Sequence, residues 1–111
     1  MAAINITKEQ FENLSRENKV VLVDYWAPWC SHCRRIAPAY EKIAEQYGEQ
    51  IVISKINIDE EPQLARSEQI EAIPTLVLYR GGQAIGSIVA PESKAAIDNF
   101  LQQHLNHGTN L

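Results

Sequence analysis

The segment from Lys19 to Tyr47 constrains the fold of this chain more than any other part of the sequence. It opens with an apolar run, Lys19–Tyr25, of the kind that a parallel sheet buries on both faces. From Arg34 to Tyr47, apolar side chains then recur at spacings of three and four residues, which predicts one buried face of a helix. A buried strand followed by an amphipathic helix is typical of α/β proteins. We therefore expect an α/β fold.

The rest of the chain continues this alternation of strands and helices. Thr7–Gln10 is a capping box, which predicts the start of a helix, and Gly81-Gly82 between two apolar stretches predicts a hairpin. The predicted strands are Ile4–Ile6, Lys19–Tyr25, Ile51–Ile58, Thr75–Arg80 and Gln83–Val89, and the predicted helices are Thr7–Ser15, Arg34–Tyr47, Asp59–Glu68 and a final helix that carries Ile97–Leu105. This order predicts a central mixed five-stranded sheet flanked by four helices on both faces.

Length and composition predict one domain, residues 1–111, ending in a polar tail from Asn106 to Leu111. The net charge of −4 argues against a nucleic-acid-binding role, because phosphate binding needs a basic face. No stretch approaches the roughly 18 apolar residues of a membrane span. Residues Met1–Asn5 lack the charged and apolar regions of a secretory signal, so we expect a reducing, cytoplasmic location.

The two cysteines of the chain, Cys30 and Cys33, stand where the apolar strand gives way to the helix. Ligand and catalytic sites in open α/β sheets lie beyond the carboxyl ends of the parallel strands. A cysteine at a helix N-terminus faces unpaired amide donors and the positive end of the helix dipole, which favour its thiolate. We therefore expect Cys30 to attack a substrate disulfide and Cys33, one turn further in and more buried, to resolve the mixed disulfide.

Two other functions stay open at this point. Cys30 and Cys33 with His104 and His107 make up a possible Cys2His2 zinc set, although two residues between the histidines is one fewer than the usual minimum. The chain could also be a non-catalytic adaptor that uses its fold for docking, because fold does not fix function. An adaptor has no need of both cysteines, whereas an enzyme that exchanges disulfides needs the pair.

The sequence around the cysteines resembles the thioredoxin family. The resemblance is carried by the run Trp26–Cys33 with Asp24 before it and Pro38 after it, and by Ile73-Pro74-Thr75. Lys55–Asp59 and Gly82 also fall in the family's order, and the resemblance covers essentially the whole chain. It implies the thioredoxin fold and a monomeric protein-disulfide oxidoreductase with a redox-active Cys30–Cys33 disulfide and no bound cofactor. It also implies protein disulfide substrates and regeneration by an NADPH-dependent thioredoxin reductase.

The resemblance also implies roles for residues around the cysteines. Asp24 would accept the proton of Cys33, with Lys55 as its charge partner, and the position of Asp24 at the end of an apolar run predicts burial and a raised pKa. Pro74 would be cis and would place the backbone of Ile73 beside Cys30, where an extended substrate can pair with it. The apolar docking surface around the sulfur would consist of Pro28, Trp29, Ile73 and Ala90.

The chain departs from the family between its cysteines, where Ser31-His32 replaces the usual Gly-Pro. A histidine beside the second cysteine is more similar to protein disulfide isomerase and the bacterial disulfide oxidases. We expect His32 to stabilise the Cys30 thiolate, which would make the couple more oxidising than that of a Gly-Pro thioredoxin. The alternative is an activity like that of a disulfide oxidase or isomerase. Ala72 and Ala90 stand where the family usually has glycine, and Glu71 stands at a position that is often basic.

Overall fold

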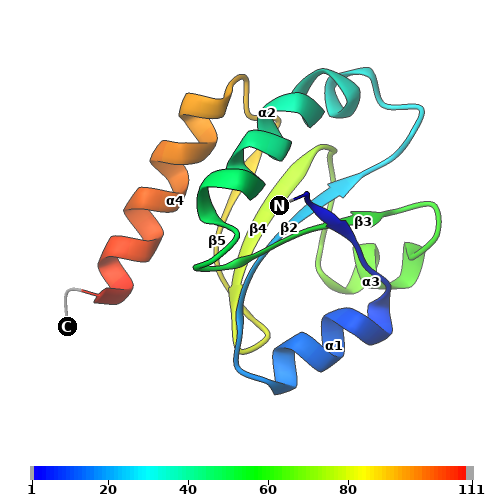
Figure 1. The fold of residues 1–111 in the computed structure, drawn as a ribbon. Coiled ribbons are helices and arrows are strands. Elements are labelled where there is room, and N and C mark those ends of the chain that lie inside the picture. Colours follow the sequence, from blue (N-terminus) through cyan, green and yellow to red (C-terminus); the bar gives the residue numbers. More distant parts are fainter. Residues whose placement is uncertain (1, 110–111) are drawn as a thin grey trace.

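The computed structural model describes the backbone of residues 2–109 and the side chains of residues 2–105. Strands and helices alternate along this range, as the sequence predicted (Figure 1). In chain order the elements are β1 (Ile4–Asn5), α1 (Lys8–Arg16), β2 (Val20–Trp26), α2 (Ser31–Tyr47), β3 (Val52–Asn57), α3 (Pro62–Ser67), β4 (Thr75–Arg80), β5 (Gln83–Val89) and α4 (Lys94–Thr109).

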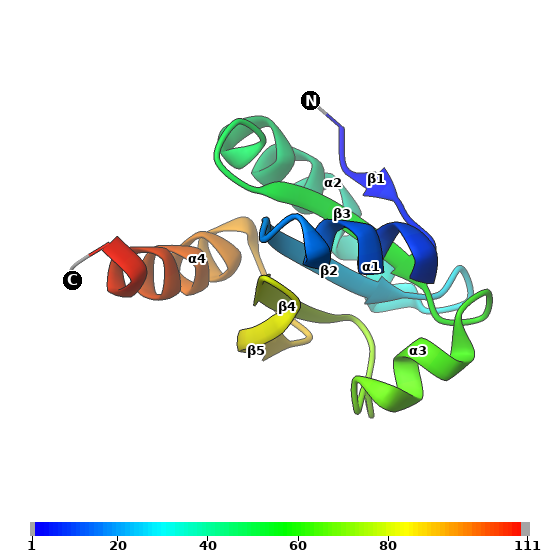
Figure 2. The ribbon, with the colours of Figure 1, turned by 90° about the horizontal axis from the view of Figure 1, so that it is seen from below.

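The strands of the described range form one mixed sheet in the order β1-β3-β2-β4-β5. Strands β1, β3 and β2 are parallel, whereas β4 runs antiparallel to β2, and β5 runs antiparallel to β4. Helices α2 and α4 cover one face of the sheet, and α1 and α3 cover the other. Figure 2 shows α4 and α3 on opposite sides of the β4–β5 hairpin. The α/β architecture predicted from the sequence is confirmed.

Two apolar clusters hold these layers together. One cluster lies between the sheet and helices α2 and α4. In it, Leu22 of β2 and Leu78 of β4 pack with Ile43 of α2 and Leu101 of α4, and all four side chains are fully buried. Phe11 of α1 packs in the cluster on the opposite face. Burying one such side chain contributes about 1.5–3 kcal/mol to folding, so these clusters fix the sheet without help from the cysteines.

The turns explain where the elements begin and end. Gly81 and Gly82 have positive φ angles of 56° and 85°, the conformation that a tight two-residue hairpin needs, and the hairpin bounds match the prediction. Helix α2 begins at Ser31, three residues earlier than predicted, because Cys30 acts as its N-cap: the Cys30 Sγ accepts a hydrogen bond from the Cys33 N–H. The pair therefore lies in the cap and first turn of the helix.

Helix α4 continues to Thr109, so the backbone of the predicted polar tail is helical from Asn106 to Thr109. No proline or glycine interrupts the chain between Ile97 and Gly108, and the helical hydrogen bonds simply continue. Asn110 and Leu111 lie outside the described residues. None of the helices in the described range is long and apolar enough to cross a lipid bilayer.

Candidate active site

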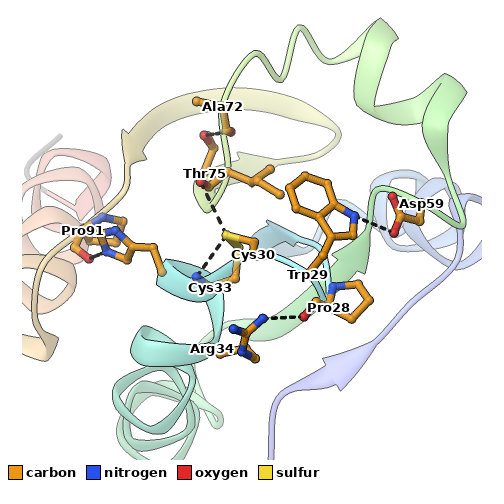
Figure 3. Close-up of a disulfide and its surroundings, with 11 residues drawn as sticks. Pro28, Trp29, Cys30, Cys33, Arg34, Asp59, Ala72, Thr75 and Pro91 are labelled. Carbon is orange, nitrogen blue, oxygen red and sulfur yellow. Dashed lines mark hydrogen bonds between the residues drawn. A yellow bond between two sulfur atoms is a disulfide. The ribbon is translucent and has the colours of Figure 1, made fainter.

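The cysteine pair forms a disulfide beyond the carboxyl end of β2, between the N-cap and the first turn of α2 (Figure 3). The Cα atoms are 5.2 Å apart, and the Cys33 N–H lies 3.2 Å from the Cys30 Sγ. Cys33 is 3% exposed and Cys30 is 7% exposed, so Cys33 is the more buried of the two, as predicted. A thiolate at the Cys30 position would accept an amide hydrogen bond at a helix N-terminus, which is the arrangement that lowers a cysteine pKa.

Two side-chain hydrogen bonds fix the loop before the disulfide. The Trp29 Nε1–H donates to the Asp59 Oδ2 at 3.0 Å, although 65% of Trp29 is exposed. Arg34 donates from Nη1 to the Pro28 carbonyl at 2.7 Å (Figure 3). Arg34 therefore holds the loop that precedes its own helix. These bonds present the Trp29 ring beside the disulfide.

The loop before β4 supplies the opposite wall. The Ile73–Pro74 peptide bond is cis, as predicted, and the Ile73 carbonyl lies 3.8 Å from the Cys30 Sγ. The Ala90 N–H donates to the Pro74 carbonyl at 2.7 Å, which joins the β5–α4 loop to this wall. Ala90 has a φ of 48°, a left-handed conformation that alanine adopts at some cost. The backbone of Ile73 thus stands beside the sulfur at the entrance to the site.

The side chain of His32 joins α2 to the β5–α4 loop. Its Nε2 lies 2.9 Å from the Pro91 carbonyl, and since a carbonyl only accepts, Nε2 carries the proton and donates. His32 is half-buried and Ser31 is exposed. The sequence predicts that His32 tunes the couple, but its partner Pro91 lies 59 positions away and gave no sequence signal.

Asp24 lies in β2, where it pairs in register with Lys55 of the parallel strand β3. It is only 1% exposed, and its Oδ1 has no hydrogen-bond partner among the described residues. Burial raises the pKa of Asp24 from 3.8 to about 7, and the Lys55 ammonium offsets part of that rise. A carboxyl that titrates near neutral pH can accept and return a proton under physiological conditions.

The Lys55 side chain crosses the indole of Trp26, with Nζ 4.4 Å from the ring centroid. Trp26 is half-buried and packs against a cluster of Ala27, Cys30 and Cys33, so it lies against the disulfide. The Trp26 Nε1 has no hydrogen-bond partner among the described residues. Trp26 therefore lies between the cysteine cluster and the Lys55 ammonium, which makes a cation–π contact with the ring.

His104, from the alternative zinc set, has contacts of a different kind. Its Nδ1 bonds the Phe100 carbonyl within α4 at 2.9 Å, and its ring lies so close to Gly86 of β5 that a Cβ there would overlap it. The side chain of His107 lies outside the described residues. Within the described range, no group of three or more histidine, cysteine or acidic side chains is placed to hold a metal ion.

Sequence reasoning missed Asp59 as part of the site. Asp59 follows β3 just as the cysteine loop follows β2, and the carboxyl ends of neighbouring parallel strands meet at one edge of the sheet. That rule applied to both strands would have placed Asp59 beside Trp29. The hydrogen bond of His32 to the Pro91 carbonyl could not have been found in this way, because it depends on how α2 and the β5–α4 loop meet.

Comparison with known proteins gives a consistent family. The profile of the family described as Thioredoxin matches residues 2–103. The chain is 41% identical over 105 residues to Thioredoxin 1 of Nostoc sp. (strain PCC 7120), which covers 94% of this chain and 98% of that protein. It is also 41% identical over 87 residues to the Bifunctional thioredoxin reductase/thioredoxin of Mycobacterium leprae. This match covers 78% of this chain and 19% of that protein. The crystal structure of Malassezia sympodialis thioredoxin superposes with a TM-score of 0.84 at 33% identity, covering 94% of each chain.

Proposed function

Since this chain belongs to the thioredoxin family of thiol–disulfide oxidoreductases, we propose that it reduces substrate protein disulfides through Cys30 and Cys33. The observation that carries this proposal is the position of the pair: the Cys30 Sγ caps α2 and accepts the Cys33 N–H at 3.2 Å. The same interaction stabilises a Cys30 thiolate when the pair is reduced, because the amide and the helix dipole both favour negative charge there.

Cys30 is the nucleophile and Cys33 is the resolving thiol. The Cys30 thiolate attacks one sulfur of the substrate disulfide, forms a mixed disulfide and releases the other substrate sulfur as a thiolate. The Cys33 thiolate then attacks Cys30, closes the internal disulfide and releases the second substrate sulfur. The substrate gains two electrons and the Cys30–Cys33 pair loses them. The deeper burial of Cys33 supports this order, since an incoming protein disulfide reaches Cys30 first.

Asp24 accepts the proton of the Cys33 thiol during resolution, and Lys55 is its charge partner. The pKa of about 7 supports this role, because the carboxyl is about half ionised at neutral pH and its burial makes the anion a stronger base than an exposed aspartate. Lys55 limits the pKa rise through its charge. Asp24 otherwise lacks a partner for Oδ1 among the described groups, which is costly for a residue with only a structural role.

Substrate segments bind across the surface made by Pro28, Trp29, Ile73, Pro74 and Ala90. Trp29 supplies exposed apolar area, and the Ile73 carbonyl lies 3.8 Å from the Cys30 Sγ, within the reach of a peptide that pairs with it in an extended conformation. The hydrogen bonds that hold these loops support binding without large rearrangement.

Ser31 and His32 make the couple more oxidising than that of a Gly-Pro thioredoxin. His32 lies in the first turn of α2, and its ring is held by the Pro91 carbonyl, so its position relative to the helix N-terminus is fixed. A polar, ionisable ring there favours the reduced, thiolate-bearing state. If this effect is large, the protein acts as a disulfide oxidase or isomerase, which is the second candidate function.

The partner, oligomeric state and location that we infer for this chain follow from its family. Thioredoxins work with thioredoxin reductase, and the Mycobacterium leprae relative carries both names in one protein. We infer an NADPH-dependent reductase as the partner of this chain, a monomeric state, and a reducing compartment, the cytoplasm. The chemistry needs no bound cofactor, because both electrons reside in the sulfur pair.

The direct test is reduction of the interchain disulfides of insulin with dithiothreitol as the electron source. The wild-type chain should accelerate precipitation of the free insulin chains, and Cys30→Ser should not accelerate it. A metal-dependent or absent activity in the folded, reduced protein would contradict the proposal. Reactivation of scrambled ribonuclease, measured in parallel, would favour the isomerase function if it exceeded the reductase activity.

A further inference from the structure

A groove of about 640 Å³ lies on the face of the sheet that carries α1 and α3. One wall is the segment Glu68–Ala72 between α3 and β4, and the floor is formed by residues of β4 and β5, among them Val77 and Ser87. Two apolar side chains of the lining, Ile85 and Val89, are 37% and 57% exposed. The groove is therefore an open, partly apolar surface on the edge strand.

One end of the groove meets the entrance to the disulfide. Ala72 lines the groove and precedes Ile73, whose carbonyl lies 3.8 Å from the Cys30 Sγ. Val89 lines the groove and precedes Ala90, which is bonded to the Pro74 carbonyl. A chain segment whose cysteine reacts at Cys30 can continue into the groove without leaving the protein surface.

The charge in the groove has one sign. Glu68 and Glu71 line its wall, none of the lining residues is basic, and β5 carries no charged residue from Gln83 to Val89. The Glu68 carboxylate is held in place, because Oε1 accepts a hydrogen bond from the Tyr79 hydroxyl at 2.7 Å. Tyr79 is 1% exposed and its hydroxyl is also bonded to that of Tyr25 at 2.8 Å. A carboxylate anchored from the core presents a fixed negative charge to whatever lies in the groove.

We propose that this groove binds the part of a substrate chain that flanks its reactive cysteine, and that it selects extended segments carrying lysine or arginine. The apolar floor accepts the aliphatic stem of such a side chain, and the Glu68 and Glu71 carboxylates pair with its charged end. This proposal rests on the proposed reductase function and names the class of substrate that it prefers.

The test uses peptides with one cysteine, linked as a mixed disulfide to thionitrobenzoate, in which a single lysine is moved along an otherwise neutral sequence. Matched peptides carry alanine or glutamate at the same position. The Cys30 thiolate attacks the peptide sulfur and releases thionitrobenzoate, which is coloured, and Cys33 then releases the peptide thiol. The second-order rate constant of the reduced protein with each peptide is measured at low ionic strength and again at high ionic strength.

At one or more positions the lysine peptide should react about three-fold faster than the alanine peptide, which is typical of one exposed charge pair. Glu71→Gln should remove most of that advantage, and Glu71→Lys should transfer it to the glutamate peptide. Glu71 is exposed, so these variants keep the fold. Glu45→Gln is the matched control, since it removes one exposed negative charge from α2 on the opposite face and should leave the lysine preference unchanged.

Equal rates for the three peptides, or an equal loss in Glu71→Gln and Glu45→Gln, would overturn the groove proposal and leave the reductase function intact. No reaction with any peptide, the alanine peptide included, would instead contradict the reductase function itself. Concentration-dependent dimerisation that Glu71→Lys abolishes would assign the groove to a second copy of the chain and would also overturn the proposal.

Discussion

Asp24 lies in β2 and Asp59 lies just after the neighbouring parallel strand β3, yet the two carboxylates have opposite environments. Asp24 is 1% exposed and leaves one oxygen unpaired among the described groups, whereas Asp59 is exposed and accepts a hydrogen bond from Trp29. Burial raises the pKa of Asp24 to about 7. The same residue type is thus buried with a raised pKa in one case and exposed as a hydrogen-bond acceptor in the other, which fits the proton transfer that we propose for Asp24 and the loop positioning by Asp59.

The two cysteines show the same contrast between a more buried and a less buried residue, and the largest effect is expected from replacing each of them in turn. Cys33→Ser should lose essentially all turnover and accumulate a stable mixed disulfide at Cys30, because nothing remains to resolve it. Mass spectrometry without reductant measures the adduct. Cys30→Ser is the control and should trap little substrate, since Cys33 is the more buried sulfur. Equal trapping by both variants would show that Cys30 and Cys33 are equally accessible to substrate and would contradict the assigned roles.

The buried side is next tested by Asp24→Asn. Because the pKa of Asp24 is raised from 3.8 to about 7, the folded state retains a proton that the unfolded state releases between these pH values. The free energy of unfolding of the wild type therefore falls as pH rises from about 4 to 7, and it falls by as much as roughly 4 kcal/mol. The variant lacks this loss and should gain stability relative to the wild type across that window.

Urea denaturation at pH 4 and pH 8 measures this difference. Asp59→Asn is the matched control: it keeps Asp24, so its free energy of unfolding should show the same change between the two pH values as that of the wild type. The Asp24→Asn variant should also resolve mixed disulfides more slowly above pH 7. A stability difference that does not depend on pH would contradict the assignment of a raised pKa to Asp24.

A smaller effect, on the reduction potential, is expected from His32 in the first turn of α2. His32→Ala removes the hydrogen bond to Pro91 and the polar ring, and it should make the couple more reducing by about 10–30 mV. Thiol trapping in glutathione buffers measures the shift. His104→Gln, which changes a histidine on α4 that lies against β5, should leave the potential unchanged. A shift of equal size in both variants would remove His32 as a tuning residue.

The exposed side should give the smallest effect. Asp59→Ala removes the hydrogen bond that holds the Trp29 indole, so the ring samples more rotamers in the free protein. We expect KM for a protein substrate to rise about two- to three-fold, with kcat and the free energy of unfolding nearly unchanged. An equal fall in kcat would mean that Asp59 acts on the chemical step, and the contrast with Asp24 would disappear.

Much of this molecule could be predicted from the sequence because its signals are local. The β4–β5 hairpin was predicted with its observed bounds, since Gly81-Gly82 determines the turn, and the apolar run of β2 placed that strand to within one residue. The burial of Asp24 followed from its place in the same run. The start of α2 was predicted too late, because the capping interaction of the Cys30 sulfur does not appear in a pattern of apolar residues.

The contacts that could not be predicted join segments far apart in the chain. His32 reaches Pro91 across 59 positions, and the Cys30 sulfur lies beside Ile73 across 43 positions. The last of these was expected only through the family resemblance. Each depends on the relative position of loops, which the sheet order sets and which no local pattern encodes. The groove beside Glu71 escaped prediction for the same reason, since it forms between the segment Glu68–Ala72 and strands β4 and β5.

The central claim is that Cys30 and Cys33 form a reversible two-electron couple, and its reduction potential is the most direct test. The protein is equilibrated in glutathione buffers of known ratio, the free thiols are trapped, and the two states are counted by mass spectrometry. We predict one two-electron transition between the reference values of this family, about −270 mV for thioredoxin and about −180 mV for protein disulfide isomerase. The absence of any reversible transition, with the protein folded, would contradict the account.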